Sequence, residues 1–170
     1  MIDTVIVLFR SGIVLIFGVS VSLLFAGIKY TRKSNLAIAF FYIIMFIIQI
    51  LCWRMFGLQT TMKLYPLITH FPTVLFMILY FKRPWSITIS SILTAYLCCQ
   101  IPKWIGSMTA AIFGGRFTEH IAYFIAMIFV YYMLKKYVAE SVLQLMSRSL
   151  RSCLLFGAVP AFYYFFDYAS

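Results

Sequence analysis

The residues best suited to chemistry lie in two stretches of an otherwise apolar chain. His70 stands between Pro66 and Pro72, and Lys103 follows Gln100 by three residues. An imidazole can hold a proton or share a hydrogen bond, and an amide both donates and accepts. Two prolines in one helix free backbone carbonyls that polar side chains can satisfy. We predict a ligand-sensing site with His70, Gln100 and Lys103, shaped by Pro66 and Pro72. The alternatives are that His70 only caps freed carbonyls and that the basic residues only extend toward water.

Enzymatic chemistry is disfavoured. His70 with Cys98 or Cys99 would make a membrane peptidase, but a cysteine nucleophile needs an electropositive setting that the sequence does not indicate. The chain has no HExxH, GxSxG or CxxC pattern. The cysteines are interpreted as small apolar residues: Cys52, Cys98, Cys99 and Cys153. We therefore predict no enzymatic activity for this chain, no catalytic residue, no metal and no cofactor.

The composition predicts an integral membrane protein. The chain has 170 residues, of which 64% are hydrophobic and 11% charged. A soluble domain has about 45–50% apolar and about 25% charged residues. This excludes a soluble domain, a disordered tail and a secreted disulfide scaffold. The formal net charge of +10 comes from basic residues scattered between apolar runs, so we predict the lipid bilayer as a partner and no nucleic acid.

Six apolar runs approach the length of a membrane span, which needs about 20 residues. They are residues 5–28, 36–53, 65–81, 85–101, 120–134 and 153–168. Inside lipid every backbone polar group must be paired internally, so such runs form helices. We predict an all-α fold, a polytopic membrane helix bundle with about six transmembrane helices. Trp53 and Trp104 are expected at the outer membrane surface.

A seventh stretch, residues 137–152, is amphipathic. On a helical wheel Val142 and Met146 lie on the apolar side, and Glu140 lies opposite. We predict an interfacial helix, with a plain connector as the alternative. Its membrane-surface basic residues, with two that precede it, are Lys135, Lys136, Arg148 and Arg151.

The distribution of lysine and arginine predicts the orientation. One set of alternate connections carries nine basic residues: Lys29, Arg32, Lys33, Lys82, Arg83, Lys135, Lys136, Arg148 and Arg151. The other side carries five: Arg10, Arg54, Lys63, Lys103 and Arg116. Because basic loops stay in the cytoplasm, we expect a multi-pass protein with its N-terminus outside. Six spans also place the C-terminus outside with almost no tail, so we expect a fragment of a longer protein.

Four stretches carry a family resemblance. They are residues 65–72 (YPLITHFP), 81–85 (FKRPW), 90–106 (SSILTAYLCCQIPKWIG) and 156–168 (FGAVPAFYYFFDY). Together they resemble the N-terminal membrane domain of sensor histidine kinases of the GHKL ATPase type, found in clostridial-type Gram-positive bacteria. The resemblance implies location in a bacterial cell membrane and covers most of the chain.

The resemblance implies that residues 1–170 form the signal-sensing membrane domain of a two-component system, with the cytoplasmic kinase domain absent. The partners it implies are an unknown extracellular ligand, a second copy joined through the missing cytoplasmic part, and a response regulator. The family's catalytic residues carry over to no position. The alternative is a small substrate-binding membrane subunit of a transporter, which the length and helix number would also suit.

Overall fold

The computed structural model describes residues 2–169, and every regular element in this range is helical. The elements are α1 (Ile2–Phe25), α2 (Arg32–Lys63), the π-helix η1 (Pro66–His70), α3 (Phe71–Leu79), α4 (Trp85–Phe113), α5 (Arg116–Met133), the π-helix η2 (Leu134–Val138), α6 (Ala139–Arg148) and α7 (Leu150–Ala169). The prediction of an all-helical chain is confirmed.

Two helical stretches of the described chain are long and apolar enough to cross a membrane. They are Arg32–Thr61 and Phe117–Arg148. Two more, Phe9–Phe25 and Pro66–Leu79, are apolar but shorter. Large apolar side chains such as Leu36, Phe117 and Val159 lie exposed on the outer surface. This distribution supports membrane association, because a water-facing surface rarely carries wide apolar patches.

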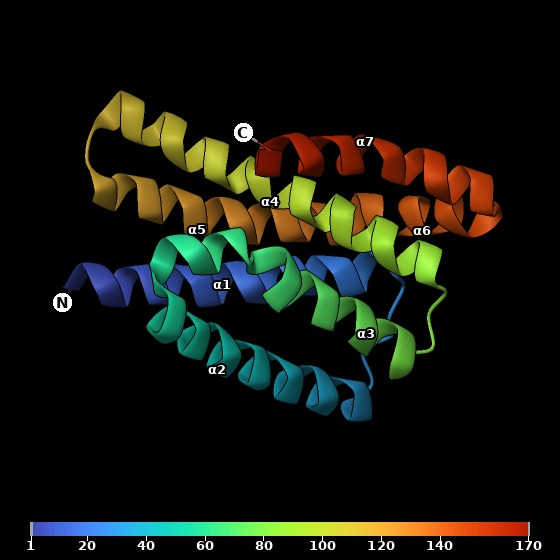
Figure 1. Ribbon diagram of the computed structural model, residues 1–170. Coiled ribbons are helices and arrows are strands. Elements are labelled where there is room, and N and C mark those ends of the chain that lie inside the picture. The colour runs from blue at the N-terminus through green and yellow to red at the C-terminus, as the bar shows by residue number, and fades with distance from the viewer. Residues whose placement is uncertain (1, 170) are drawn as a thin grey trace.

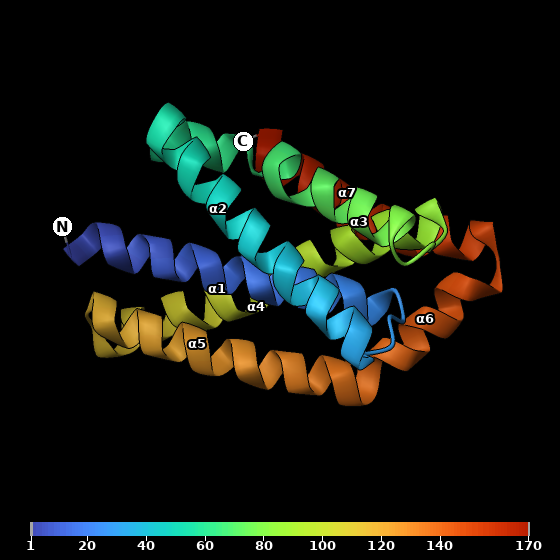
Figure 2. The same cartoon turned by 90° about the horizontal axis from the view of Figure 1, so that it is seen from below.

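The long helices run back and forth along one direction. Figures 1 and 2 show the connections between α1 and α2 and between α3 and α4 at one end, together with α6. The N-terminus and the α4–α5 connection lie at the opposite end. The two groups of basic connections thus lie at opposite ends of the bundle. The side chain of Arg116 lies outside the described residues.

Helix α4 is the centre of the bundle, since it packs against α1, α5 and α7. Helix α1 lies between two buried clusters. Phe17 and Val21 face the cluster shared with α4, α5, α6 and α7. Leu15 and Val19 face the cluster shared with α2, α3 and α4. These positions alternate as the two sides of one helix must, and α2 packs only lightly against α1.

The helices extend beyond several of the predicted spans. Helix α2 continues past residue 53 to Lys63, bending at Gly57, where φ is 77°. Helix α4 continues past residue 101 to Phe113 with Pro102 inside it. An apolar run shows which part of a helix can lie in lipid, whereas the helix itself continues until its backbone hydrogen bonds end. The end of the apolar run and the end of the helix therefore differ. The first span shows the opposite difference: α1 ends at Phe25, before residue 28, and residues 26–27 form a turn.

The predicted interfacial helix is shorter than residues 137–152. Helix α6 ends at Arg148, and Ser149 adopts extended backbone angles. The Ser152 N–H donates to Ser149 Oγ at 3.0 Å, so Ser149 caps the next helix and Arg151 belongs to α7. Val142 and Met146 are buried against the bundle. Protein packing therefore accounts for part of the amphipathic pattern.

Three segments meet at Gly27: the turn after α1, the α3–α4 connection and helix α6. Gly27 has a φ of 66°, a conformation that favours glycine, and a side chain there would collide with Leu143 of α6. The Arg83 guanidinium donates a hydrogen bond to the Gly27 carbonyl. The turn after α1, the α3–α4 connection and α6 are therefore joined to one another.

Candidate functional site

A cavity of about 620 Å³ is lined mainly by α1, α2, η1 and α4, with one residue each from α3, α5 and α7, namely Thr73, Tyr123 and Asp167. This volume falls within the range of pockets that hold small molecules. Its lining residues follow helical periodicity. On α4 they are Ile92, Ala95, Tyr96, Cys99, Gln100 and Lys103. On α1 they are Arg10, Ser11, Val14, Leu15, Gly18, Val19 and Ser22. Each helix therefore presents one continuous stripe to the cavity.

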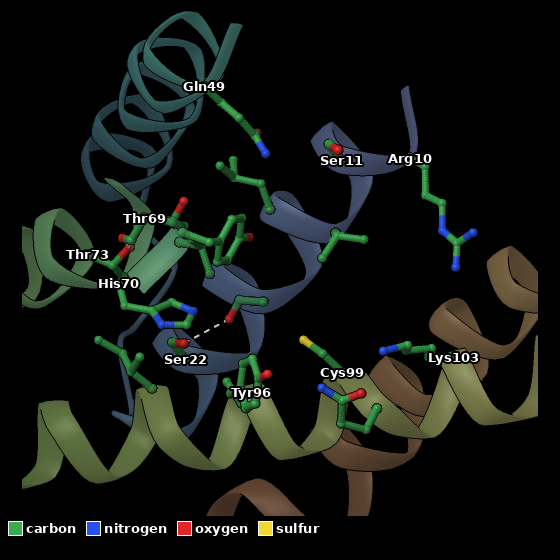
Figure 3. A pocket seen from close by; sticks show the side chains of 18 of the residues that line it. Arg10, Ser11, Ser22, Gln49, Thr69, His70, Thr73, Tyr96, Cys99 and Lys103 are labelled. Atoms are coloured by element: carbon green, nitrogen blue, oxygen red, sulfur yellow. Dashed lines mark hydrogen bonds between the residues drawn. The ribbon is translucent and has the colours of Figure 1, made fainter. Parts of the chain in front are cut away.

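The cavity has two distinguishable ends. Figure 3 shows Arg10 and Lys103 toward one end, which we call the charged end. Gln49, Thr69 and Ser22 lie toward the other, which we call the inner end. The charged end is the end of the bundle where the N-terminus lies, because Arg10 is near the start of α1.

Three of the five predicted site residues line this cavity, namely His70, Gln100 and Lys103. Gln100 is buried, His70 is half-buried and Lys103 is exposed. Pro66 and Pro72 are not lining residues. They occupy the first turns of η1 and α3, and the wide π-turn between them closes with the Phe71 N–H donating to the Pro66 carbonyl. The prolines therefore act on the backbone that carries His70.

His70 connects the cavity wall to the last helix. Its Nδ1 and the Tyr164 hydroxyl of α7 share a hydrogen bond of 2.9 Å. The rings of Tyr65 and Tyr96 lie edge-on to the imidazole, with centroids 5.3 Å and 5.8 Å away. The Tyr96 hydroxyl in turn donates to the carboxylate of Asp167, near the end of α7. Two side-chain bonds therefore join η1 and α4 to α7.

Two buried side-chain oxygens at the inner end have no hydrogen-bond partner in the described part of the chain. They are Gln49 Oε1 and Thr69 Oγ1, and the side chains are 8% and 2% exposed. Neither residue was predicted from the sequence. Gln49 could have been found as the single amide within the apolar run 36–53, because polar side chains at membrane depth are functional candidates. Thr69 carried no such signal, since a threonine also satisfies itself on its own helix.

The charged end contains an ion pair. Arg10 Nη1 lies 3.4 Å from Glu119 Oε1 of α5, and the two side chains are 30% and 27% exposed. The Arg10 guanidinium also lies 4.8 Å from the ring centroid of Tyr123. Lys103 forms no ion pair with any residue that the structure describes. Trp53, expected at the membrane surface, also lines the cavity.

The four predicted membrane-surface basic residues lie outside the cavity lining. Lys135, Lys136, Arg148 and Arg151 are all exposed. The Lys136 ammonium lies 5.1 Å from the ring centroid of Tyr137. The four cysteines are free thiols, and the residues described hold no group of three side chains suited to a metal ion. The arrangement can bind a small molecule by hydrogen bonds, by apolar contact and by the ammonium of Lys103, which has no ion-pair partner among the described residues. Comparisons with models of protein families, with curated proteins and with solved structures find no match to this chain.

Proposed function

We propose that this chain is the membrane-embedded ligand-sensing part of a sensor histidine kinase. The observation that carries the proposal is the hydrogen bond between His70, on the cavity wall, and Tyr164 of α7. A ligand that contacts His70 or Tyr96 changes the groups to which α7 is bonded. Binding in the cavity would therefore change the bonds that hold α7, the helix nearest to Ser170.

The proposed mechanism is a shift between two positions of α7. A ligand can shift such an equilibrium only by binding one arrangement more tightly than the other. Breaking the bond of His70 to Tyr164 would release α7 from η1 while its packing against α4 remains. Interfaces packed in this way tend to have discrete arrangements, so a small displacement at His70 can select between them.

The kinase assignment rests on the sequence resemblance. In this proposal the chain continues after Ser170 into a further span, a dimerising helical segment and a cytoplasmic ATP-binding domain that phosphorylates a response regulator. The reading frame downstream of Ser170 tests it. A frame that encodes these parts supports the proposal, and a stop codon beside genes for a transporter ATPase contradicts it.

We further propose that the chain crosses the bacterial membrane six times, with the N-terminus outside. The basic connections support this arrangement, since nine basic residues lie at the end of the bundle that holds α6. The charged end of the cavity then lies toward the outer side. The exposed cations of η2, Lys135 and Lys136, would lie at the inner membrane surface, where anionic lipids attract them.

The orientation can be measured with single cysteines in a chain whose native cysteines are replaced by alanine. We expect a cysteine at Thr31 to react with a membrane-impermeant maleimide only after the cells are opened, because Thr31 lies at the α6 end. A cysteine at the exposed Phe113, at the opposite end, should react in intact cells. Labelling of both from the same side would contradict the six-span arrangement.

The coupling of the cavity to α7 can be measured by hydrogen exchange in lipid nanodiscs. We expect Tyr164→Phe, which removes the hydroxyl bonded to His70, to raise amide exchange in the last two turns of α7 several-fold. One hydrogen bond contributes about 1 kcal/mol, which corresponds to about fivefold in an opening equilibrium. His70→Phe should give the same pattern. Tyr132→Phe, on the exposed side of α5, is the matched control and should leave α7 unchanged. Equal exchange in all variants would remove His70 and Tyr164 from the mechanism.

A further inference from the structure

We propose that the cavity binds an elongated amphiphilic anion whose apolar chain ends in a hydroxyl or amide group. The anionic group would lie beside Lys103, and the hydroxyl or amide group would reach Gln49 and Thr69. This inference rests on the proposal that the cavity is the ligand site, and it names the chemical class of that ligand.

The inner end requires a hydrogen-bonding group. Gln49 Oε1 is an acceptor, and Thr69 Oγ1 can donate or accept. Both atoms are buried and lack a partner in the described chain, whereas several other hydroxyls of the lining are bonded. Thr73, for example, donates to the Thr69 carbonyl at 2.7 Å, and Thr61 donates to the Gly57 carbonyl at 2.7 Å. Buried polar atoms are nearly always bonded. Five buried side-chain atoms lack a partner in the described chain, and of these only Gln49 Oε1 and Thr69 Oγ1 belong to residues that line the cavity, where a bound molecule would supply the partner.

The middle of the cavity requires an extended apolar segment. At a rise of about 1.5 Å per residue, the lining stripe of α1 from Arg10 to Ser22 extends about 18 Å. The stripe of α4 from Ile92 to Lys103 extends about 16 Å. Between these ends the walls include the side chains of Val14, Val19 and Ala95. A compact polar molecule would leave most of this length empty.

The charged end can hold an anion beside Lys103. Arg10 is paired with Glu119, and the carboxylate of Asp167, which also lines the cavity, accepts a hydrogen bond from Tyr96. Lys103 is the cation of the lining that has no ion-pair partner among the residues described. A carboxylate or phosphate at this end would supply that partner. The ammonium would remain partly hydrated, so its contribution to affinity is modest.

The inference can be tested with four twelve-carbon probes and the protein in phosphatidylcholine nanodiscs. The probes are ω-hydroxydodecanoate, which has both groups, dodecanoate, which lacks the hydroxyl, dodecanediol, which lacks the charge, and aminododecanol, which reverses it. Trp53 lines the cavity, so its emission reports occupancy. We expect ω-hydroxydodecanoate to change the emission, Trp53→Phe to abolish the change, and Trp104→Phe, which alters an exposed tryptophan, to retain it.

The affinities identify the two ends. We expect ω-hydroxydodecanoate to bind about fivefold more tightly than dodecanoate, because one buried hydrogen bond is gained. It should bind about threefold more tightly than dodecanediol, because a half-exposed ion pair is gained. Gln49→Leu should abolish the preference for ω-hydroxydodecanoate over dodecanoate and keep the preference over dodecanediol. Lys103→Gln should abolish the preference over dodecanediol and keep the preference over dodecanoate. Thr69→Val, a nearly isosteric change, should also reduce the preference for ω-hydroxydodecanoate over dodecanoate. It tests the inner end even if the Gln49→Leu variant fails to fold.

Three outcomes would overturn the inference. The first is equal affinity for all four probes, and the second is tighter binding of aminododecanol. The third is a response that persists in Trp53→Phe, which would show partition into the lipid rather than occupation of the cavity. Binding of ω-hydroxydodecanoate without any change in the exchange of α7 would instead contradict the sensor function and leave the ligand class intact.

Discussion

Gly157→Leu is expected to lower the free energy of unfolding by about 3 kcal/mol, at the upper end of the usual cost of overpacking. A side-chain carbon added at Gly157 would lie 2.6 Å from Ser90 Oγ and 3.3 Å from Ser90 Cβ. The hydroxyl can rotate, but the Cβ is fixed to α4, so leucine must push α7 away from its main packing partner. Titration with dodecyl sulfate, followed by tryptophan emission, measures the loss.

The matched control is Val159→Leu, two residues along the same helix, where the side chain is 68% exposed. This change should alter stability by no more than about 0.5 kcal/mol. Gly157→Ala should cost less than the leucine variant, because alanine also favours the helix by about 0.5–1 kcal/mol. Ser90→Ala should recover part of the cost of Gly157→Ala. Full stability in Gly157→Leu would show that α7 does not pack on α4 through Ser90.

Arg10→Met is expected to lower the free energy of unfolding by about 2 kcal/mol, between the values for exposed and buried ion pairs. The change removes the contact of 3.4 Å to Glu119 and the cation–ring contact to Tyr123. It also leaves a carboxylate, 27% exposed, without its cation. Thermal unfolding in nanodiscs measures the loss.

A double-mutant cycle isolates the ion pair. Adding Glu119→Gln to Arg10→Met should recover about half of the loss, because the unpaired charge is then removed. Arg54→Met is the matched control, since Arg54 is an exposed arginine near the same end with no ion pair among the described residues. A loss as large for Arg54→Met as for Arg10→Met would mean that the pair adds nothing to stability.

Composition and apolar runs were sufficient to predict an all-helical chain, because helices satisfy the backbone polar groups of such runs. They could not predict where the helices end. Helix α2 continues beyond Trp53 through a polar segment that remains helical, and Ser149 ends α6 by capping α7. Both boundaries depend on local backbone bonding, to which a hydropathy pattern is insensitive.

The candidate site was predictable in part. His70, Gln100 and Lys103 are polar residues within or next to two neighbouring apolar segments, and the structure places all three on one cavity. Their role in sensing stays a prediction. Gln49 could have been singled out as the one amide of its apolar run, whereas Thr69 could not. That both oxygens are unpaired in the described chain depends on how α2 is rotated relative to η1. The bond from His70 to Tyr164 joins residues 94 positions apart, a pairing that one sequence does not reveal.

The joint at Gly27 has a mechanical consequence for α2. The turn after α1, the α3–α4 connection and α6 are tied together at that end, whereas α2 packs only lightly against α1 along its length. The far end of α2 is joined to η1 through residues 64–65 and packs against it. Trp53 and Leu58 of α2 line the cavity, so a displacement of α2 relative to α1 would change the width of the cavity along that wall.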